Sequence, residues 1–272
     1  MKLRLGRIPY ANVRPVYYDL DRKKGPEWLT CVEAPPTTLN NMLAGGLLDV
    51  SPVSSVAYAR HFKDWFLLPG LSISSWGQVM SVLLAHRAPL KDISNRPIVL
   101  STESATSVEL LKLCLERKWV FPVYKTEKVD NPKDLAADAA GALVIGDKAL
   151  KWSWGDEEGL MTDLGDCWYQ WKGLPFVFAV WAVRRSFVEK NRPLVLQLVD
   201  ILHQSLKNGL SDISSITESV AFDLKMRTGT INEYYRRLKY ALGSKEQKAL
   251  LEFFRMMHKK KTLEREVSIE FF

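Results

Sequence analysis

The chain has few of the residues that build disulfide frameworks and metal sites. It contains three cysteines, Cys31, Cys114 and Cys167, which are odd in number and far apart in the sequence. Its four histidines are scattered and lack the close spacing that metal ligands need. We therefore expect no disulfide framework and no metal site, and the cysteine usage favours a reducing compartment.

Long apolar segments are also missing. No segment approaches the roughly 20 apolar residues that a membrane-spanning helix requires, and residues 1–10 mix leucine with basic residues instead of forming the apolar core of a secretion signal. We therefore expect a cytoplasmic protein with no membrane partner. Because glycine-rich phosphate loops, dinucleotide fingerprints and nucleophile elbows are absent too, we expect no cofactor.

Positive charge is in moderate excess, with a formal net charge of +7 at pH 7. Part of the excess lies in one late run, residues 258–261, which a solvated surface segment explains. A nucleic-acid-binding protein typically presents a basic stripe with interleaved aromatic residues, and the sequence has no such stripe. We expect no nucleic-acid partner, and a mild positive field that attracts small anions.

Length and element order predict an α/β protein of two lobes. A chain of 272 residues suggests about two domains at roughly 150 residues each. Two apolar strand candidates, residues 77–85 and 175–183, are long enough to run from one lobe into another. We therefore predict a discontinuous lobe of residues 1–84 and 182–272, an inserted lobe of residues 85–181, and two hinge strands between them.

The final third of the chain carries apolar residues at helical spacing. The spacing predicts four helices, at residues 193–206, 214–226, 231–241 and 245–259.

Small hydroxyl residues follow several predicted strands, at the points where a helix or a new strand begins. They are Ser54, Ser55, Ser74, Ser75, Ser104, Thr106 and Ser107. A helix start offers free N–H groups and a partial positive charge, and hydroxyl groups add further donors, so these clusters suit carboxylates. We expect them to face a cleft from both lobes. The alternative is that each hydroxyl only caps its own helix.

Two further polar residues lie at strand ends. Asn12 follows the first predicted strand, and Asp147 follows a strand near residues 142–145, after a glycine that allows close backbone approach. A local role explains each of them equally well, Asn12 as a turn residue and Asp147 as a helix cap. Such a cleft binds and orients a ligand well but is poor in strong bases.

Several motifs together resemble one family. They are the residues at 12–15, GLLDVSPVSS at 46–55, LPGLSISS at 68–75, GQVMSV at 77–82, IGDKAL at 145–150 and GLPFVFAVW at 173–181. In combination they resemble the chorismate dehydratases, which begin the futalosine route to menaquinone. The resemblance implies a two-lobed, type II periplasmic-binding-protein-like fold with a ligand cleft between the lobes. It also implies a hydro-lyase that converts chorismate to 3-[(1-carboxyvinyl)oxy]benzoate.

The resemblance also suggests roles for the polar residues. We expect Asn12 and Ser75 nearest the reacting ring as catalytic residues, and the other hydroxyl residues to bind the two carboxylates of this dianionic substrate. Asp147 is a further substrate-site candidate, although a carboxylate there would repel a dianion. The sequence assigns neither a proton acceptor nor an oligomeric state.

Two alternatives stay open. The 1,4-dihydroxy-6-naphthoate synthases of the same pathway share the fold and some motifs, but they typically carry a histidine near position 147, where this chain has Asp147 without a neighbouring histidine. The other alternative is a non-catalytic binding protein for a small anion. The absence of an obvious base favours it, and the absence of a secretion signal argues against a transport role.

Overall fold

The chain divides into two compact units. The structure is a computed structural model and describes residues 2–23, 25–127, 135–152 and 160–272. Unit 1 comprises Met1–Ser74 and Val177–Phe272, and unit 2 comprises Ser75–Phe176. The division falls at the end of strand β4 (Trp65–Ser75) and at the start of strand β10 (Phe176–Arg184). The boundaries expected from the sequence, after residues 84 and 181, lie further along the chain.

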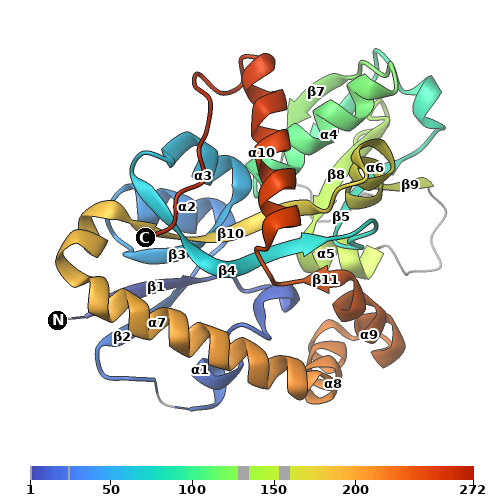
Figure 1. Ribbon diagram of the computed structural model, residues 1–272. Helices are drawn as coiled ribbons and strands as arrows, with labels where there is room; N and C mark the ends of the chain where they lie inside the picture. The colour runs from blue at the N-terminus through green and yellow to red at the C-terminus, as the bar shows by residue number, and fades with distance from the viewer. Residues whose placement is uncertain (1, 24, 128–134, 153–159) are drawn as a thin grey trace. The chain divides into compact units, whose positions relative to one another are not determined.

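Unit 1 contains a six-stranded mixed sheet in the order β11-β4-β10-β3-β1-β2, in which β4 and β10 lie side by side (Figure 1). Its other strands are β1 (Leu3–Arg7), β2 (Leu29–Glu33), β3 (Val50–Ser54) and β11 (Leu238–Lys239). β1 runs parallel to both β2 and β3, whereas β10 runs antiparallel to β3. The short helices between the first strands are η1 (Ala11–Val13), α1 (Tyr18–Arg22), α2 (Pro36–Ala44) and α3 (Ser55–His61).

A buried carboxylate ties together three strands of this sheet. Asp49, whose side chain is only 3% exposed, lies just before β3 and accepts hydrogen bonds from Arg4 on β1 and Arg184 at the end of β10. Burial raises the pKa of Asp49, but the hydrogen bonds from the two arginines outweigh burial and hold that pKa below its usual value. The Asp49 carboxylate, just before β3, therefore forms one ion pair with β1 and another with the end of β10.

The C-terminal part of unit 1 is helical. It comprises α7 (Arg185–Ser211), α8 (Ile213–Leu224), α9 (Thr228–Arg237) and α10 (Ser244–Lys259). α7 is interrupted at Asn191, two residues before Pro193, which cannot donate a helical hydrogen bond. Figure 1 shows α8 and α9 together at the end of α7.

One helix predicted in this region is too long. The sequence-based helix at residues 231–241 was wrong beyond Arg237, because Leu238 is extended and begins β11. The backbone there pairs with β4 instead: the Ser72 N–H donates to the Tyr240 carbonyl over 2.8 Å.

Unit 2 contains a five-stranded sheet in the order β7-β6-β8-β5-β9. Its strands are β5 (Val82–His86), β6 (Pro97–Leu100), β7 (Val123–Thr126), β8 (Gly141–Ile145) and β9 (Leu160–Asp163). Its helices are η2 (Leu90–Asp92), α4 (Ala105–Arg117), α5 (Gly146–Trp152) and α6 (Leu164–Lys172). Every residue of β5 and β8 is buried, which explains why both read as unbroken apolar runs.

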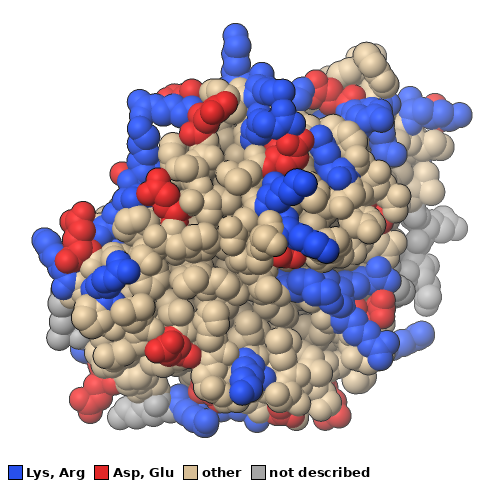
Figure 2. Space-filling view, viewed as in Figure 1, with Lys and Arg blue, Asp and Glu red and all other residues tan. Residues whose placement is uncertain are grey.

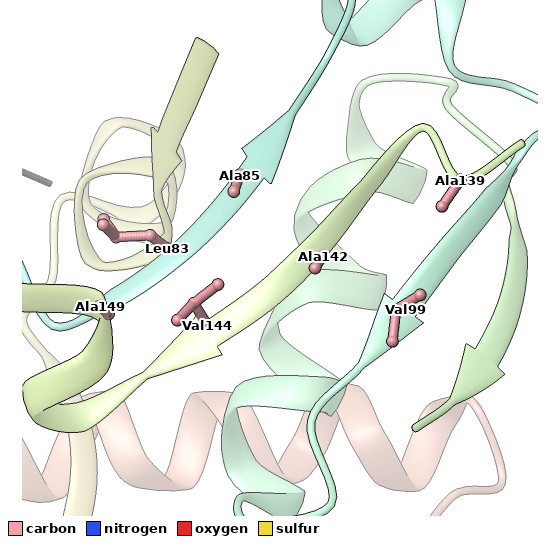
Figure 3. Packing of buried hydrophobic residues seen from close by; sticks show 7 residues of the cluster. All are labelled: Leu83, Ala85, Val99, Ala139, Ala142, Val144 and Ala149. Carbon is pink, nitrogen blue, oxygen red and sulfur yellow. The ribbon is translucent and has the colours of Figure 1, made fainter. Parts of the chain in front are cut away.

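The core of unit 2 is built mainly from small and branched side chains of these strands. Figure 3 shows Leu83 and Ala85 on β5, Val99 on β6 and Val144 on β8 in one cluster with Ala149 of α5. Leu135 and Trp152 pack against the cluster. The small residues allow the helices to lie close to the sheet.

The predicted hinge strand at residues 77–85 was also wrong in its first half. Residues 77–81 form bends, and β5 begins only at Val82. Gly77 and Met80 have positive φ angles of 88° and 66°, which a strand does not tolerate. The segment is therefore a shaped loop that precedes β5.

The surface charges are mixed. On the face shown in Figure 2, lysine and arginine side chains are interspersed with aspartate and glutamate rather than gathered in one stripe. Among the described residues, no helix combines the length and apolar character needed to cross a membrane.

We predict that Asp49→Asn lowers the free energy of unfolding by about 2 kcal/mol at neutral pH, because charge-assisted hydrogen bonds from two arginines are weakened. The folded pKa of Asp49 lies below the unfolded value of 3.8, so this stabilisation is present above pH 3.8 and is lost as the pH falls through the folded pKa. Urea unfolding at neutral and acidic pH measures both effects.

The matched control is Asp64→Asn, because the Asp64 side chain is 74% exposed. We expect it to change the stability by less than about 0.5 kcal/mol. Equal effects of the two substitutions, or an Asp49 effect that grows on acidification, would contradict the assigned role.

Candidate functional site

In unit 1, the polar candidates gather at one edge of the sheet. β1 and β3 are parallel neighbours, with Leu5 opposite Val50, so their carboxyl ends meet at the same edge. Asn12 follows β1 there, and Ser54 and Ser55 end β3 and begin α3. The strand arrangement therefore brings these three residues to one side of unit 1.

The loop that carries Asn12 is held by two tyrosines from the C-terminal part of the chain. Tyr235 donates its hydroxyl to the Ala11 carbonyl over 2.8 Å, and Tyr240 donates to the Asn12 carbonyl over 3.0 Å. Burial raises the pKa of Tyr240 well above its ordinary value, so its hydroxyl stays protonated and able to donate. The backbone of the loop is thus fixed by its carbonyl groups.

The side chain of Asn12 is different. Within the described part of the chain, its Oδ1 is buried and has no hydrogen-bond partner. A buried acceptor of this kind costs free energy until a donor reaches it. Asn12 Oδ1 is therefore a buried acceptor, unpaired among the described residues, in the loop that follows β1.

The three unit 1 serines use their hydroxyl groups within the protein. Ser54 Oγ accepts from the Ala57 N–H over 3.3 Å and so caps α3. Ser55 donates to the Val177 carbonyl over 2.6 Å, and Ser74 donates to the Lys239 carbonyl over 3.3 Å. Ser74 therefore bonds to the residue next to Tyr240, one of the two tyrosines that hold the Asn12 loop. Each of the three side chains has a local structural role.

Ser75, which the sequence-based boundary after residue 84 places in the first lobe with Ser74, is the first residue of unit 2 and lies at the start of the shaped loop. It is fully buried, and its hydroxyl donates to the Gly77 carbonyl over 2.8 Å. Gly165 in the first turn of α6 packs directly against both residues: a Cβ there would lie 2.6 Å from Gly77 O and 2.8 Å from Ser75 Oγ. Only glycine fits at this point of contact.

Asp163 holds the far end of the same loop. Its carboxylate accepts the N–H groups of Val79 and Met80, over 3.0 Å and 2.7 Å to Oδ2, and caps α6 through the Asp166 N–H over 3.1 Å. Burial raises the pKa of Asp163, although these backbone hydrogen bonds oppose the shift. One carboxylate therefore joins the loop after Ser75 to the start of α6.

The hydroxyl cluster of unit 2 lies at the N-terminus of α4. Ser104 caps the helix, since its Oγ accepts from the Ser107 N–H over 3.2 Å, and the two hydroxyl oxygens lie 2.8 Å apart. Thr106 and Ser107 are buried, with 1% and 3% exposure. The start of a thirteen-residue helix carries a partial positive charge, which suits a carboxylate.

Asp147 lies in the first turn of α5, where a negative charge is favoured by the helix dipole. β6 and β8 are parallel, so the segments that follow them, which carry Ser104 and Asp147, lie at the same edge of the sheet. Lys148 of α5 also lies 3.4 Å from Glu103, next to Ser104. Asp147 therefore lies near the hydroxyl cluster. Its position in the first turn of α5 is equally explained by a structural role, in which its negative charge stabilises the helix.

Several residues that support these positions were not predicted from the sequence. They are Asn40, Asp163, Gly165, Tyr235 and Tyr240. Asn40 contacts both the backbone N–H and the hydroxyl of Ser54 at 3.4 Å. Of these five, only Asp163 carries a local signal, because an aspartate just before a helix is a common N-cap. The tyrosines act on residues more than 200 positions away, a distance that no local pattern reveals.

Comparisons with known proteins show the family of this chain. A family model described as menaquinone biosynthesis matches residues 3–259. The chorismate dehydratase of Thermus thermophilus is 33% identical to this chain over 266 residues, which cover 92% of this chain and 93% of that protein.

Solved structures show the fold. Protein AF1704 from Archaeoglobus fulgidus has a TM-score of 0.79 at 18% identity, covering 96% of this chain and 98% of that one. The periplasmic aliphatic sulphonate binding protein SsuA from Escherichia coli has a TM-score of 0.68 at 15% identity, covering 98% and 90%. The predicted α/β, periplasmic-binding-protein-like fold is confirmed.

We predict that Gly165→Ala destabilises the protein by about 1–3 kcal/mol, because the added methyl group would overlap the Gly77 carbonyl and the Ser75 hydroxyl. Thermal or urea unfolding measures the change. Gly229→Ala is the control: Gly229 lies in helix α9, and no atom lies within 4 Å of the position that an added methyl group would take, so alanine should stabilise by up to about 1 kcal/mol. Two changes of the same sign and size would contradict the contact with Ser75.

Proposed function

Because this chain belongs to the menaquinone biosynthesis family, we propose that it removes water from chorismate to give 3-[(1-carboxyvinyl)oxy]benzoate. The name of the Thermus thermophilus relative, chorismate dehydratase, supports an enzyme with this substrate. The observation that carries the proposal is the buried, unpaired Oδ1 of Asn12. It offers an acceptor for a hydroxyl donor such as the one that chorismate loses.

The reaction needs little beyond orientation and proton management. A ring C–H bond and the ring C–O bond break, the hydroxyl leaves with the proton as water, and the ring becomes aromatic. No electrons pass to another molecule, so the chemistry requires no redox cofactor. A site that holds the substrate in one orientation and stabilises the departing hydroxyl can therefore catalyse this reaction.

We assign Asn12 and Ser75 to the reacting ring. The Asn12 Oδ1 accepts the hydrogen bond of the ring hydroxyl and so fixes its orientation, and the hydrogen bond replaces an unpaired buried atom. Ser75 supplies a hydroxyl oxygen on a loop that Asp163 and Gly165 hold in place. The two residues belong to different units, and each is held by contacts within its own unit.

The hydroxyl residues serve the two carboxylates in this proposal. Ser104, Thr106 and Ser107 present the N-terminus of α4, where backbone N–H groups and the helix dipole favour an anion. Ser54, Ser55 and Ser74 are the hydroxyl residues that unit 1 contributes to substrate binding. Because Ser55 and Ser74 donate to backbone carbonyls, we expect them to act through the loops they hold. Asp147 lies near this cluster, and its negative charge would repel a substrate carboxylate that is bound in the wrong position.

The assignment as a hydro-lyase and the cytoplasmic location are parts of the same proposal, and the location stays a prediction from the sequence. The naphthoate synthase and the non-catalytic binding protein stay as alternatives that the following test distinguishes.

We predict that the purified protein converts chorismate to the aromatic enolpyruvyl ether, followed by absorbance and mass. Asn12→Ala and Ser75→Ala should each lower kcat by about 100-fold or more, because each removes an oriented polar contact at the reacting ring. Circular dichroism checks that both variants fold.

The controls are Asn41→Ala and Ser211→Ala, which alter exposed residues of α2 and α7. We expect both to turn over chorismate at the wild-type rate. Near-normal rates for Asn12→Ala or Ser75→Ala overturn that residue's role. Chorismate left unchanged by the wild-type protein refutes the proposed reaction and directs attention to the synthase, and then to simple binding.

A further inference from the structure

Unit 2 contains a cavity of about 610 Å³ whose walls are β5, β9, α4 and α6. Cys114 and Cys167 both line it, together with Lys118. The cavity meets the C-terminal end of α4, whereas Ser104 stands at the N-terminal end. At 1.5 Å per residue, thirteen residues separate Ser104 from Arg117 by about 20 Å along the helix axis. The cavity is therefore separate from the hydroxyl cluster at the start of α4, although Met80 and Asp163, which hold the loop after Ser75, also line it.

The two thiols that line this cavity lie on neighbouring helices. Cys114 on α4 is buried, and Cys167 on α6 is partly exposed. A side-chain hydrogen bond links Cys114 to Cys167. α4 and α6 pack against each other, so the pair bridges two neighbouring helices of one unit.

The two sulfur atoms differ in reactivity. The hydrogen bond from Cys114 lowers the pKa of Cys167, with help from the positive charge of Lys118, although burial and the carboxylates of Asp166 and Asp163 oppose the shift. The same hydrogen bond and burial raise the pKa of Cys114. Cys167 is also the more exposed of the two thiols that line the cavity, so Cys167 is the attacking group and Cys114 is the second thiol.

We propose that Cys167 and Cys114 form a thiol–disulfide exchange site that accepts a small-molecule disulfide in this cavity. The Cys167 thiolate attacks one sulfur of that disulfide, the S–S bond of the small molecule breaks, and its first half leaves as a thiolate that takes a proton from solvent. Cys114 then loses its proton to solvent and attacks the Cys167 sulfur, which releases the second half as a thiol. Two protein thiols are oxidised to one disulfide, and the small disulfide is reduced to two thiols.

The test uses the full chain carrying Cys31→Ser, because Cys31 is an exposed cysteine of unit 1 that would otherwise react. The probe is 2-hydroxyethyl disulfide, which is neutral and small. We expect intact-mass measurements to show a transient single adduct and then a protein lighter by two hydrogens, about 2 Da. Peptide mapping should place the transient adduct on Cys167 and the final cross-link between Cys114 and Cys167.

Two further variants in the same background separate the roles. Cys114→Ser should keep the adduct on Cys167 permanently, because the second thiol is gone. Cys167→Ser should react at least about 10-fold more slowly, since the remaining buried thiol is a poor nucleophile. Substitution of cysteine by serine at one of these sites can affect folding, and the peptide map of the protein that retains both thiols decides the matter without either variant.

Either of two results would overturn the proposal. One is a stable adduct on Cys167 while Cys114 is present, because the second step would then not occur. The other is no reaction of the Cys31→Ser protein under conditions that oxidise a free dithiol.

Discussion

An unpaired polar atom in a protein interior carries a free-energy cost, and the account of this protein depends on one such atom, Asn12 Oδ1. The cost persists because the surrounding contacts leave the loop no alternative. Tyr235 and Tyr240 bind the carbonyl groups of Ala11 and Asn12, so the loop cannot turn away without breaking these hydrogen bonds. A ligand that donates a hydrogen bond to Asn12 would recover this energy at the position where the proposed bond cleavage occurs.

In unit 2, Ser75, which we propose contacts the reacting ring, is likewise held by neighbouring residues. Ser75 is fixed by its hydrogen bond to Gly77 and by the close approach of Gly165. Asp163 holds the loop further along, at Met80, and also begins α6. Such supporting contacts restrict the motion of the loop. The proposed reaction needs an oriented substrate more than it needs strong bases, and it therefore requires residues that are held in place.

Local patterns predicted much of the fold because they report local physics. The strand at residues 175–183 and the helices at 214–226 and 245–259 were confirmed, since their apolar spacing and flanking residues act within a few positions. The helix at residues 231–241 failed because pairing with β4 overrode its helical spacing, and the strand at 77–85 failed because Asp163 shapes the preceding loop. The candidate hydroxyl residues were visible as strand-end clusters. Their long-range partners were not, because contacts between distant positions leave no periodic signal.

In the proposed reaction, Asn12 accepts a hydrogen bond from the ring hydroxyl that chorismate loses. A crystal structure of the Ser75→Ala variant with chorismate bound tests this contact. We expect Asn12 Oδ1, which is buried and unpaired among the described residues, to accept the ring hydroxyl at about 3 Å. Chorismate bound with no contact to Asn12 would contradict the proposal.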